Sequence, residues 1–180
     1  MYGMIHRAVR QMVLDTRGEA TWAEIERAAG LGPAEMISAE VYDDEVTLKL
    51  IGATAEILAE PVDALLLAFG RYWISFAERG SFGRILDFTG TDLVSFIGNL
   101  DNMHRGVQAV MPDARMPTFH LVDSTPGRLI VSYASSRTGL ERFVEGLLLG
   151  LLDRFGLTGS VSERPANGHG RQFLLTYSTI

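Results

Sequence analysis

The sequence predicts an α+β fold, with a helical first part followed by an antiparallel sheet. Up to about residue 115 the apolar residues recur at helical spacing. Beyond that point, pairs of segments with strand-like alternation flank one strongly apolar helix. The 180 residues, 47% hydrophobic and 21% charged, have the composition of a folded globular chain. Helices and strands segregated along the chain in this way favour the α+β class.

The first three helices are predicted from their apolar stripe and their end signals. A helix starts almost at residue 1, with a stripe formed by Met4, Ile5, Ala8, Val9, Met12 and Val13. Residues 21–24 read T-x-x-E, a capping box that predicts the start of a second helix, and Gly30 ends it. Asp43 or Asp44 caps a third helix, which runs to about Ala59.

Two longer helices follow. Pro61 suits the first turn of a fourth helix that ends at Gly80, with one side formed by Val62, Leu66, Phe69, Trp73 and Phe76. Thr91 or Asp92 opens a fifth helix that ends before Pro112, and its apolar face carries Ile97, Leu100, His104, Val107 and Met111. One polar side chain, His104, therefore lies within an apolar stripe.

In the second part, a hairpin is predicted from strands 117–123 and 128–136 around the turn 124–127. A wide apolar helix follows from Leu140 to Phe155 and ends at Gly156. Residues 161–163 and 172–179 form a closing hairpin around the loop 165–170. We expect a single domain, 1–180, with a helical subdomain of about 1–60 and the remainder in about 61–180.

Composition excludes several classes of function. The chain has no cysteine, which excludes disulfides, thiolate metal sites and a cysteine nucleophile. A net charge of −6 argues against nucleic-acid binding. Sequence motifs of hydrolases, nucleotide-binding loops and zinc proteases do not occur, so we expect no enzyme activity. No apolar run is long enough to cross a membrane, and the lack of a signal peptide predicts a cytoplasmic protein.

The four histidines are spread along the chain, and His104 is the one that points to a function. His6 is expected to face solvent or an adjacent helix, His120 to point away from the core, and His169 to lie in a loop. His104 sits among apolar residues, so it is either a core histidine bonded to a backbone carbonyl or a metal ligand.

A second observation supports the ligand interpretation of His104. Tyr133, Ser135 and Arg137 alternate in the predicted strand 128–136 and just beyond it, so the three would project from one face. Leu129 and Val131 precede them on that face, which therefore changes from apolar to polar. Such a face suits a large apolar ligand with carboxylates at its edge, because Arg137 can bind a carboxylate through two hydrogen bonds. Haem b has this shape, and its iron takes an imidazole ligand.

These residues resemble a known family. Tyr133-x-Ser135-x-Arg137, the segment 100–104 (Leu-Asp-Asn-Met-His), Pro117 and the opening Met-Tyr-Gly are similar to the H-NOX family. H-NOX domains are the haem nitric oxide/oxygen binding domains of bacteria, where they stand alone, and of soluble guanylate cyclase. The resemblance extends over essentially the whole chain and implies a noncovalent haem b buried between the helical part and the sheet.

The resemblance also implies a role for each matching residue. His104 would be the iron ligand, and Tyr133, Ser135 and Arg137 would hold the haem propionates. Pro117 would press on the macrocycle. The walls of the pocket would be formed by Ile5, Val9, Trp73, Phe143 and Leu147 on the distal side and by Leu100 on the proximal side. Plain core packing is the alternative for each wall residue.

The gas is predicted from a missing hydroxyl. Oxygen-binding members of the family have a distal tyrosine that donates to bound oxygen, and the matching position here is Phe143. Without that donor, the resemblance implies an NO sensor, which also binds CO, with no catalysis of its own. NO would weaken the bond between iron and His104, and the signal would pass to a separate histidine kinase or cyclic-di-GMP enzyme.

Three alternatives remain at this stage. Trp73 keeps an N–H that could serve an oxygen-binding protein of the same family. A peroxidase-like haem enzyme would need a distal His/Arg pair, which the apolar distal residues do not provide. A haem-free interaction module would make His104 a core residue only.

Overall fold

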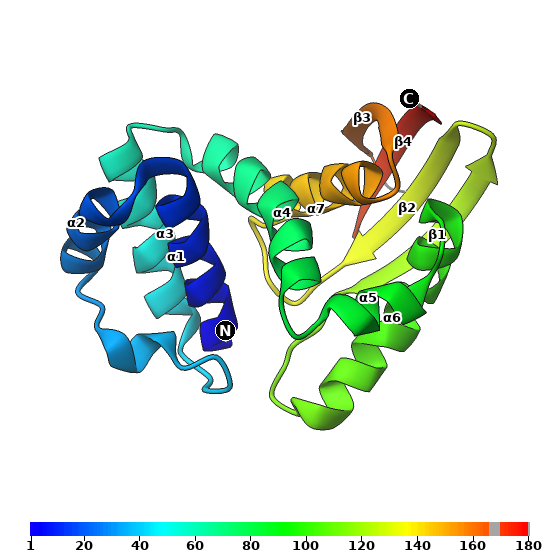
Figure 1. The fold of residues 1–180 in the computed structure, drawn as a ribbon. Helices are drawn as coiled ribbons and strands as arrows, with labels where there is room; N and C mark the ends of the chain where they lie inside the picture. The colour runs from blue at the N-terminus through cyan, green and yellow to red at the C-terminus, as the bar shows by residue number, and fades with distance from the viewer. Residues whose placement is uncertain (166–169, 180) are drawn as a thin grey trace. The chain divides into compact units, whose positions relative to one another are not determined.

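The computed structural model describes residues 1–165 and 170–179 and confirms the α+β prediction (Figure 1). His169 and most of the predicted loop 165–170 lie outside the described residues. The chain divides into two compact units, residues 1–69 and 70–180, and the border falls within one helix, α4. Each unit is considered by itself below.

The first unit is helical. It contains α1 (Gly3–Arg17), α2 (Glu19–Ala29), the short 3₁₀ helix η1 (Pro33–Met36), α3 (Asp44–Leu58) and the start of α4 (Val62–Arg79). The apolar stripe predicted for the first helix is confirmed, because its inward residues Ala8, Val9, Met12 and Val13 are buried. They share the interior of this unit with side chains of the next two helices, among them Trp22, Ile25, Leu50 and Ile51.

The predicted start of the second helix is wrong by three residues, because the N-cap residue is Gly18 and not Thr21. Helix α2 begins at Glu19, after Gly18, so Thr21 lies inside the helix and does not cap it. Its hydroxyl instead donates to the carbonyl of Arg17, 3.2 Å away, as a threonine within a helix commonly does. The predicted end is confirmed, since Gly30 adopts a left-handed conformation with φ of 65°.

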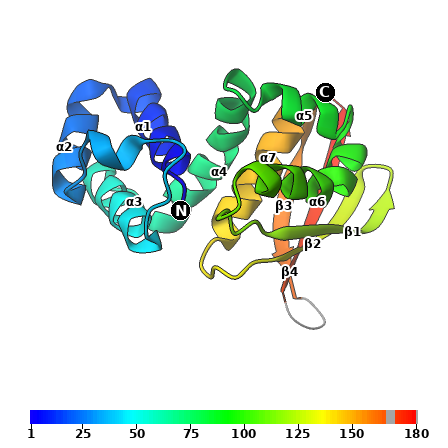
Figure 2. The same ribbon diagram turned by 90° about the horizontal axis from the view of Figure 1, so that it is seen from below.

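The second unit combines helices with a four-stranded antiparallel sheet (Figure 2). After the end of α4 come α5 (Gly83–Thr89), α6 (Leu93–Val110), β1 (Thr118–Thr125), β2 (Arg128–Ala134), α7 (Glu141–Arg154), β3 (Leu157–Arg164) and β4 (Arg171–Thr179). The strand order is β1-β2-β4-β3, and α6 packs on β1 while α7 packs on β3 and β4. Short α5 was not predicted, because seven residues are too few to establish a helical period.

Alternation along the central strands places the core on one side of the sheet. Leu129, Val131 and Tyr133 of β2 are buried, and Leu129 and Val131 lie opposite Leu175 and Phe173 of β4. Helix α7 covers this face with the buried residues Val144, Leu148, Leu151 and Leu152. Among the described residues, no helix is both long and apolar enough to cross a membrane.

Glycines bring α4 and α7 unusually close together. A side chain at Gly70 would overlap the carbonyl of Phe143, and one at Gly150 would lie 2.8 Å from the carbonyl of Arg71. Arg71 and Asp153 add an ion pair between the same two helices, with nitrogen–oxygen distances of 2.5 and 2.7 Å. The α4–α7 contact is therefore a close backbone-to-backbone approach, which only glycine permits at these two positions.

Candidate functional site

His104 has one ring nitrogen fixed and the other open. It lies on the inner side of α6, and its Nδ1–H donates to the carbonyl of Pro117 over 3.0 Å. Its ring also contacts Phe119, with centroids 5.9 Å apart. Within the described residues Nε2 has no hydrogen-bond partner, and this atom is not fully buried. A bond at Nδ1 fixes the tautomer that leaves the Nε2 lone pair free to bind a metal.

Burial favours the neutral form of this imidazole. It lowers the pKa of His104, and this effect outweighs the hydrogen bond to Pro117 and the negative charge of Asp101, both of which raise the pKa. His104 is therefore uncharged at neutral pH, which is the form that can ligate a metal.

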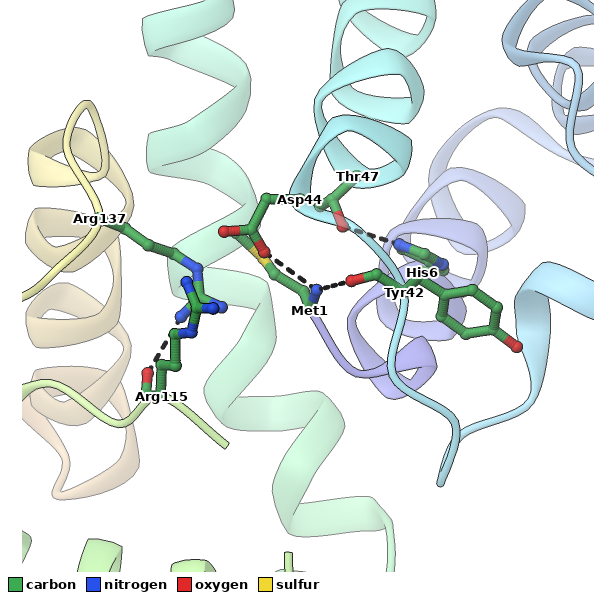
Figure 3. Close-up of polar contacts among 7 residues, drawn as sticks. All are labelled: Met1, His6, Tyr42, Asp44, Thr47, Arg115 and Arg137. Atoms are coloured by element: carbon green, nitrogen blue, oxygen red, sulfur yellow. Dashed lines mark hydrogen bonds and ion pairs between the residues drawn. The ribbon is translucent and has the colours of Figure 1, made fainter. Parts of the chain in front are cut away.

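The segment that carries Pro117 is held from several sides. Gln108 donates to the carbonyl of Ala114 over 3.2 Å, and the guanidinium of Arg137 donates to the carbonyl of Arg115 over 3.0 Å (Figure 3). These bonds, together with the one from His104, keep the chain between α6 and β1 in place. The sequence held no sign of these bonds, because their acceptors are backbone carbonyls.

The predicted face of Tyr133, Ser135 and Arg137 requires a correction. Strand β2 ends at Ala134, so Ser135 and Arg137 lie in the loop after the strand and do not continue its alternation. The three residues are nevertheless linked, because Tyr133 shares a hydrogen bond with Ser135, whose Oγ accepts the Arg137 N–H over 3.0 Å. Such a serine turn redirects the chain and replaces the hydrogen bonding of the strand.

Tyr133 is the buried member of this group. It is 5% exposed, and its ring lies 5.3 Å from that of Phe119, centroid to centroid. Burial raises its pKa, so the phenol keeps its proton at neutral pH and remains a hydrogen-bond donor. Phe119 therefore connects Tyr133 with His104 in one aromatic row.

The predicted wall residues of the second unit fall into two groups. Leu100 is buried one turn before His104 on α6. Trp73, Phe143 and Leu147 belong to the α4–α7 contact, because Gly70, one turn before Trp73, abuts the backbone of Phe143 and Leu147. All three are partly buried, and Trp73 and Leu147 pack against the core of this unit.

The two remaining wall residues lie on α1 in the first unit. Val9 is fully buried, and Ile5 is partly exposed one turn before it. Their spacing of four residues places them on one side of α1, as predicted.

The other described histidines differ from His104. His6 is fully buried, and its Nε2 lies 2.8 Å from the hydroxyl of Thr47 on α3 (Figure 3). It thus faces an adjacent helix, one of the two predicted options, and not solvent. His120 is 70% exposed and points away from the core, as predicted, and it pairs with Asp101 over 3.3 Å. No three His, Cys, Asp or Glu side chains gather into a metal site in the described part of the chain.

A comparison with models of protein families shows to which family the chain belongs. Residues 2–163 match the model of the Haem-NO-binding family. The chain belongs to the Haem-NO-binding family. Membership confirms the resemblance to H-NOX domains, and the cofactor of this family of gas sensors is haem.

Curated relatives are much longer than this chain. Soluble guanylate cyclase gcy-31 of Caenorhabditis elegans is 25% identical over 163 residues, which are 91% of this chain and 23% of the cyclase. Soluble guanylate cyclase gcy-35 of the same organism is 29% identical over 152 residues, 82% of this chain and 22% of the cyclase. The chain thus spans less than a quarter of either Haem-NO-binding relative.

Solved H-NOX structures share the fold. The H-NOX protein from S. oneidensis in the Fe(II)NO ligation state is similar with a TM-score of 0.84 and 20% identity, over 99% of this chain and 100% of that chain. The unliganded Fe(II) H-NOX protein from K. algicida gives a TM-score of 0.80 and 21% identity, over 100% of this chain and 98% of that chain.

The residues around His104 fit the family's cofactor. A haem iron held in its macrocycle needs one neutral imidazole from the protein, and His104 has Nε2 open for it. The macrocycle needs apolar and aromatic neighbours, which the buried side chains of Leu100 and Phe119 would supply. Its two carboxylates need donors, and Tyr133 and Arg137 are connected through Ser135 near the end of β2.

Proposed function

We propose that this chain is a haem-based sensor of nitric oxide in which His104 ligates ferrous haem b. The observation that carries this proposal is the orientation of His104, with Nδ1 bound to the Pro117 carbonyl and Nε2 open. Haem, when bound, supplies an iron that takes up a diatomic gas. The protein supplies the ligand, its orientation and the surroundings of the macrocycle.

His104 and Pro117 act as a pair in this proposal. The carbonyl of Pro117 fixes the tautomer and the angle of the imidazole. The same hydrogen bond keeps Pro117 next to His104. A change in the position of His104 is therefore transmitted to the segment between α6 and β1. This coupling is one way in which a ligand bound at His104 would bias a conformational equilibrium.

Arg137, Ser135 and Tyr133 bind the propionates in this proposal. The serine turn fixes the backbone of Arg137, so its guanidinium starts from a defined position. Arg137 contributes a charge-assisted contact, and the two hydroxyls contribute neutral ones, which are weaker. The contact of Arg137 with the Arg115 carbonyl ties this group to the segment of Pro117.

The absence of a distal tyrosine supports nitric oxide as the gas, with CO as a further ligand. By the resemblance, Phe143 on α7 matches the position where oxygen-binding relatives have their hydroxyl, and Leu147 and Trp73, the wall residues assigned with it, are an aliphatic and an aromatic side chain. A partly charged bound oxygen needs a donor that Phe143 does not have, whereas NO binds ferrous haem without one. The indole N–H of Trp73 is the one observation that favours an oxygen-binding protein of the same family.

Output through a separate protein completes the proposal. Residues 2–163 match a haem-binding family, so we assign sensing to this domain and the response to a partner protein. The resemblance to bacterial H-NOX domains favours a histidine kinase or a cyclic-di-GMP enzyme as the partner, in the cytoplasm.

Absorption spectra of the reduced protein without gas, in air and with NO test the proposal. We expect a haem spectrum that changes with NO and CO but yields no stable oxygen complex in air. A stable oxygen complex in the parent would overturn the assignment to NO and make Trp73 the candidate donor. A colourless protein would overturn the sensor and support the interaction module.

The substitution Phe143→Tyr tests the reason for this selectivity. A new hydroxyl near bound oxygen is worth about 1.5–3 kcal/mol in a dry pocket, so oxygen affinity should rise roughly tenfold to a hundredfold. Affinity for NO should change far less. Phe143→Leu, which adds no donor, is the matched control and should not bind oxygen.

A further inference from the structure

Asp101 makes two contacts that link α6 to β1. Its Oδ1 accepts the backbone N–H of Phe119 over 2.8 Å, and its Oδ2 lies 3.3 Å from Nδ1 of His120. Its side chain is 19% exposed, so the carboxylate is mostly enclosed. A carboxylate that accepts a backbone N–H makes a strong, charge-assisted hydrogen bond.

The bond from Phe119 is important because of the strand it belongs to. β1 is an edge strand paired only with β2, so the N–H groups on its other side have no strand to bind. Asp101 supplies the acceptor for one of them at the start of β1. Without that acceptor this N–H would have to find water or lose its bond.

Two hydrogen bonds in opposite directions therefore join α6 to the start of β1. His104 donates to the carbonyl of Pro117, and Phe119 donates to the carboxylate of Asp101. Asp101 and His104 are three residues apart on one side of α6, and Pro117 and Phe119 are two apart in the facing segment. The four residues form a closed ring of contacts, so the position of Pro117 depends on the anchor at Phe119.

We propose that Asp101 is a positioning residue for His104: by holding the Phe119 amide, it keeps the Pro117 carbonyl where it orients the imidazole. This inference rests on the proposed role of His104 as the iron ligand. The contact of Asp101 with His120 contributes little to it, because the His120 side chain is 70% exposed and water competes for such a contact.

Three variants of the haem-loaded protein separate this role from general stability. Asp101→Ala removes the acceptor, Asp101→Asn keeps an oxygen acceptor without the charge, and Asn99→Ala is the matched control. Asn99 also lies on α6 and donates to a backbone carbonyl, that of Thr89, over 3.0 Å, but on the side of α5. The readouts are hydrogen exchange at the Phe119 amide and the iron–histidine stretching band of the reduced protein.

In Asp101→Ala we expect exchange at Phe119 to become roughly tenfold to a hundredfold faster, and the stretching band to shift or broaden. Asp101→Asn should change exchange by less than about threefold and keep the band in place, because its side-chain oxygen still accepts. Asn99→Ala should change neither. If Asp101→Ala does not fold, Asp101→Glu, which displaces the carboxylate by one methylene, should shift the band.

Two results would overturn the inference. One is an unchanged band in Asp101→Ala or, in its place, Asp101→Glu, since the imidazole would then be oriented without this anchor. The other is an equal shift in Asp101→Asn and Asp101→Ala, since the charge and not the contact would then be responsible. Failure of the proposed function is distinguishable, because it would remove the iron–histidine band from the parent itself.

Discussion

Each of the two units has one histidine on the inner side of a helix, and the two imidazoles differ in which ring nitrogen is hydrogen-bonded. His6 in the helical unit and His104 in the sheet-containing unit both lie on apolar helix faces. His6 is fully buried, and its Nε2 is bound by the hydroxyl of Thr47. His104 is bound at Nδ1 by a backbone carbonyl, and its Nε2 is open. The partner of the ring, and not the apolar face, separates a structural histidine from a candidate ligand.

Other polar contacts join elements within the helical unit. The N-terminal ammonium pairs with Asp44 over 3.0 Å and donates to the carbonyl of Tyr42 (Figure 3). The hydroxyl of Tyr42 donates to the carbonyl of Ala34. These bonds join the N-terminal residue, η1 and the start of α3, so they stabilise the unit that contains His6.

Removal of His104, whose Nε2 is unbonded among the described residues, should have the largest effect on haem binding. His104→Gly deletes the proposed iron ligand, so we expect purified protein to retain almost no haem, with partial recovery when free imidazole is added. The haem content per chain, measured by absorption, checks this. Full haem retention without imidazole would show that His104 is not the iron ligand, and the distinction from His6 would then fail.

Removal of His6, whose Nε2 is bonded to Thr47, should affect stability and not haem binding. His6→Ala leaves a cavity and an unpaired Thr47, so the free energy of unfolding should fall by about 2–4 kcal/mol. Thr47→Val, which removes only the hydroxyl, should cost about 1–3 kcal/mol. Denaturant unfolding measures both. Loss of haem from a folded His6→Ala protein would contradict the comparison.

The polar residues after β2 should contribute next. Arg137→Ala removes a charge-assisted contact that solvent partly screens, so haem should dissociate roughly fivefold to thirtyfold more readily. Ser135→Ala removes a neutral hydroxyl and should change haem affinity less than Arg137→Ala does. Haem transfer to apomyoglobin measures both rates. Equal and unchanged rates would refute the propionate assignment.

The smallest expected effect is a loss of stability in alkali. Burial raises the pKa of Tyr133 above the ordinary 10.0, so the unfolded chain releases this proton first and stability falls as pH rises through that value. Tyr133→Phe should cost about 1 kcal/mol at pH 8 but lose less than the parent between about pH 9 and 11. Urea unfolding at these pH values would contradict this if the two proteins lost stability in parallel.

Much of the fold is determined by the sequence itself, because local rules govern it. Apolar periodicity predicted the stripe of α1, and glycine predicted the end of α2 at Gly30. The capping box at Asp92 and Ser95 agrees with the predicted start of the helix that carries His104. Local rules failed where two possible N-caps lay close together. The sequence pattern favoured Thr21, but the helix begins after Gly18, one turn earlier.

The candidate site depended on contacts that only the tertiary structure decides. Periodicity placed His104 on an apolar face, but its partner, the Pro117 carbonyl, is a backbone group of the kind every residue has. The end of β2 at Ala134 moved Ser135 and Arg137 into a turn, where hydrogen bonds replace strand alternation. A sequence records side chains, whereas the orientation of an imidazole depends on which backbone oxygen the fold places beside it.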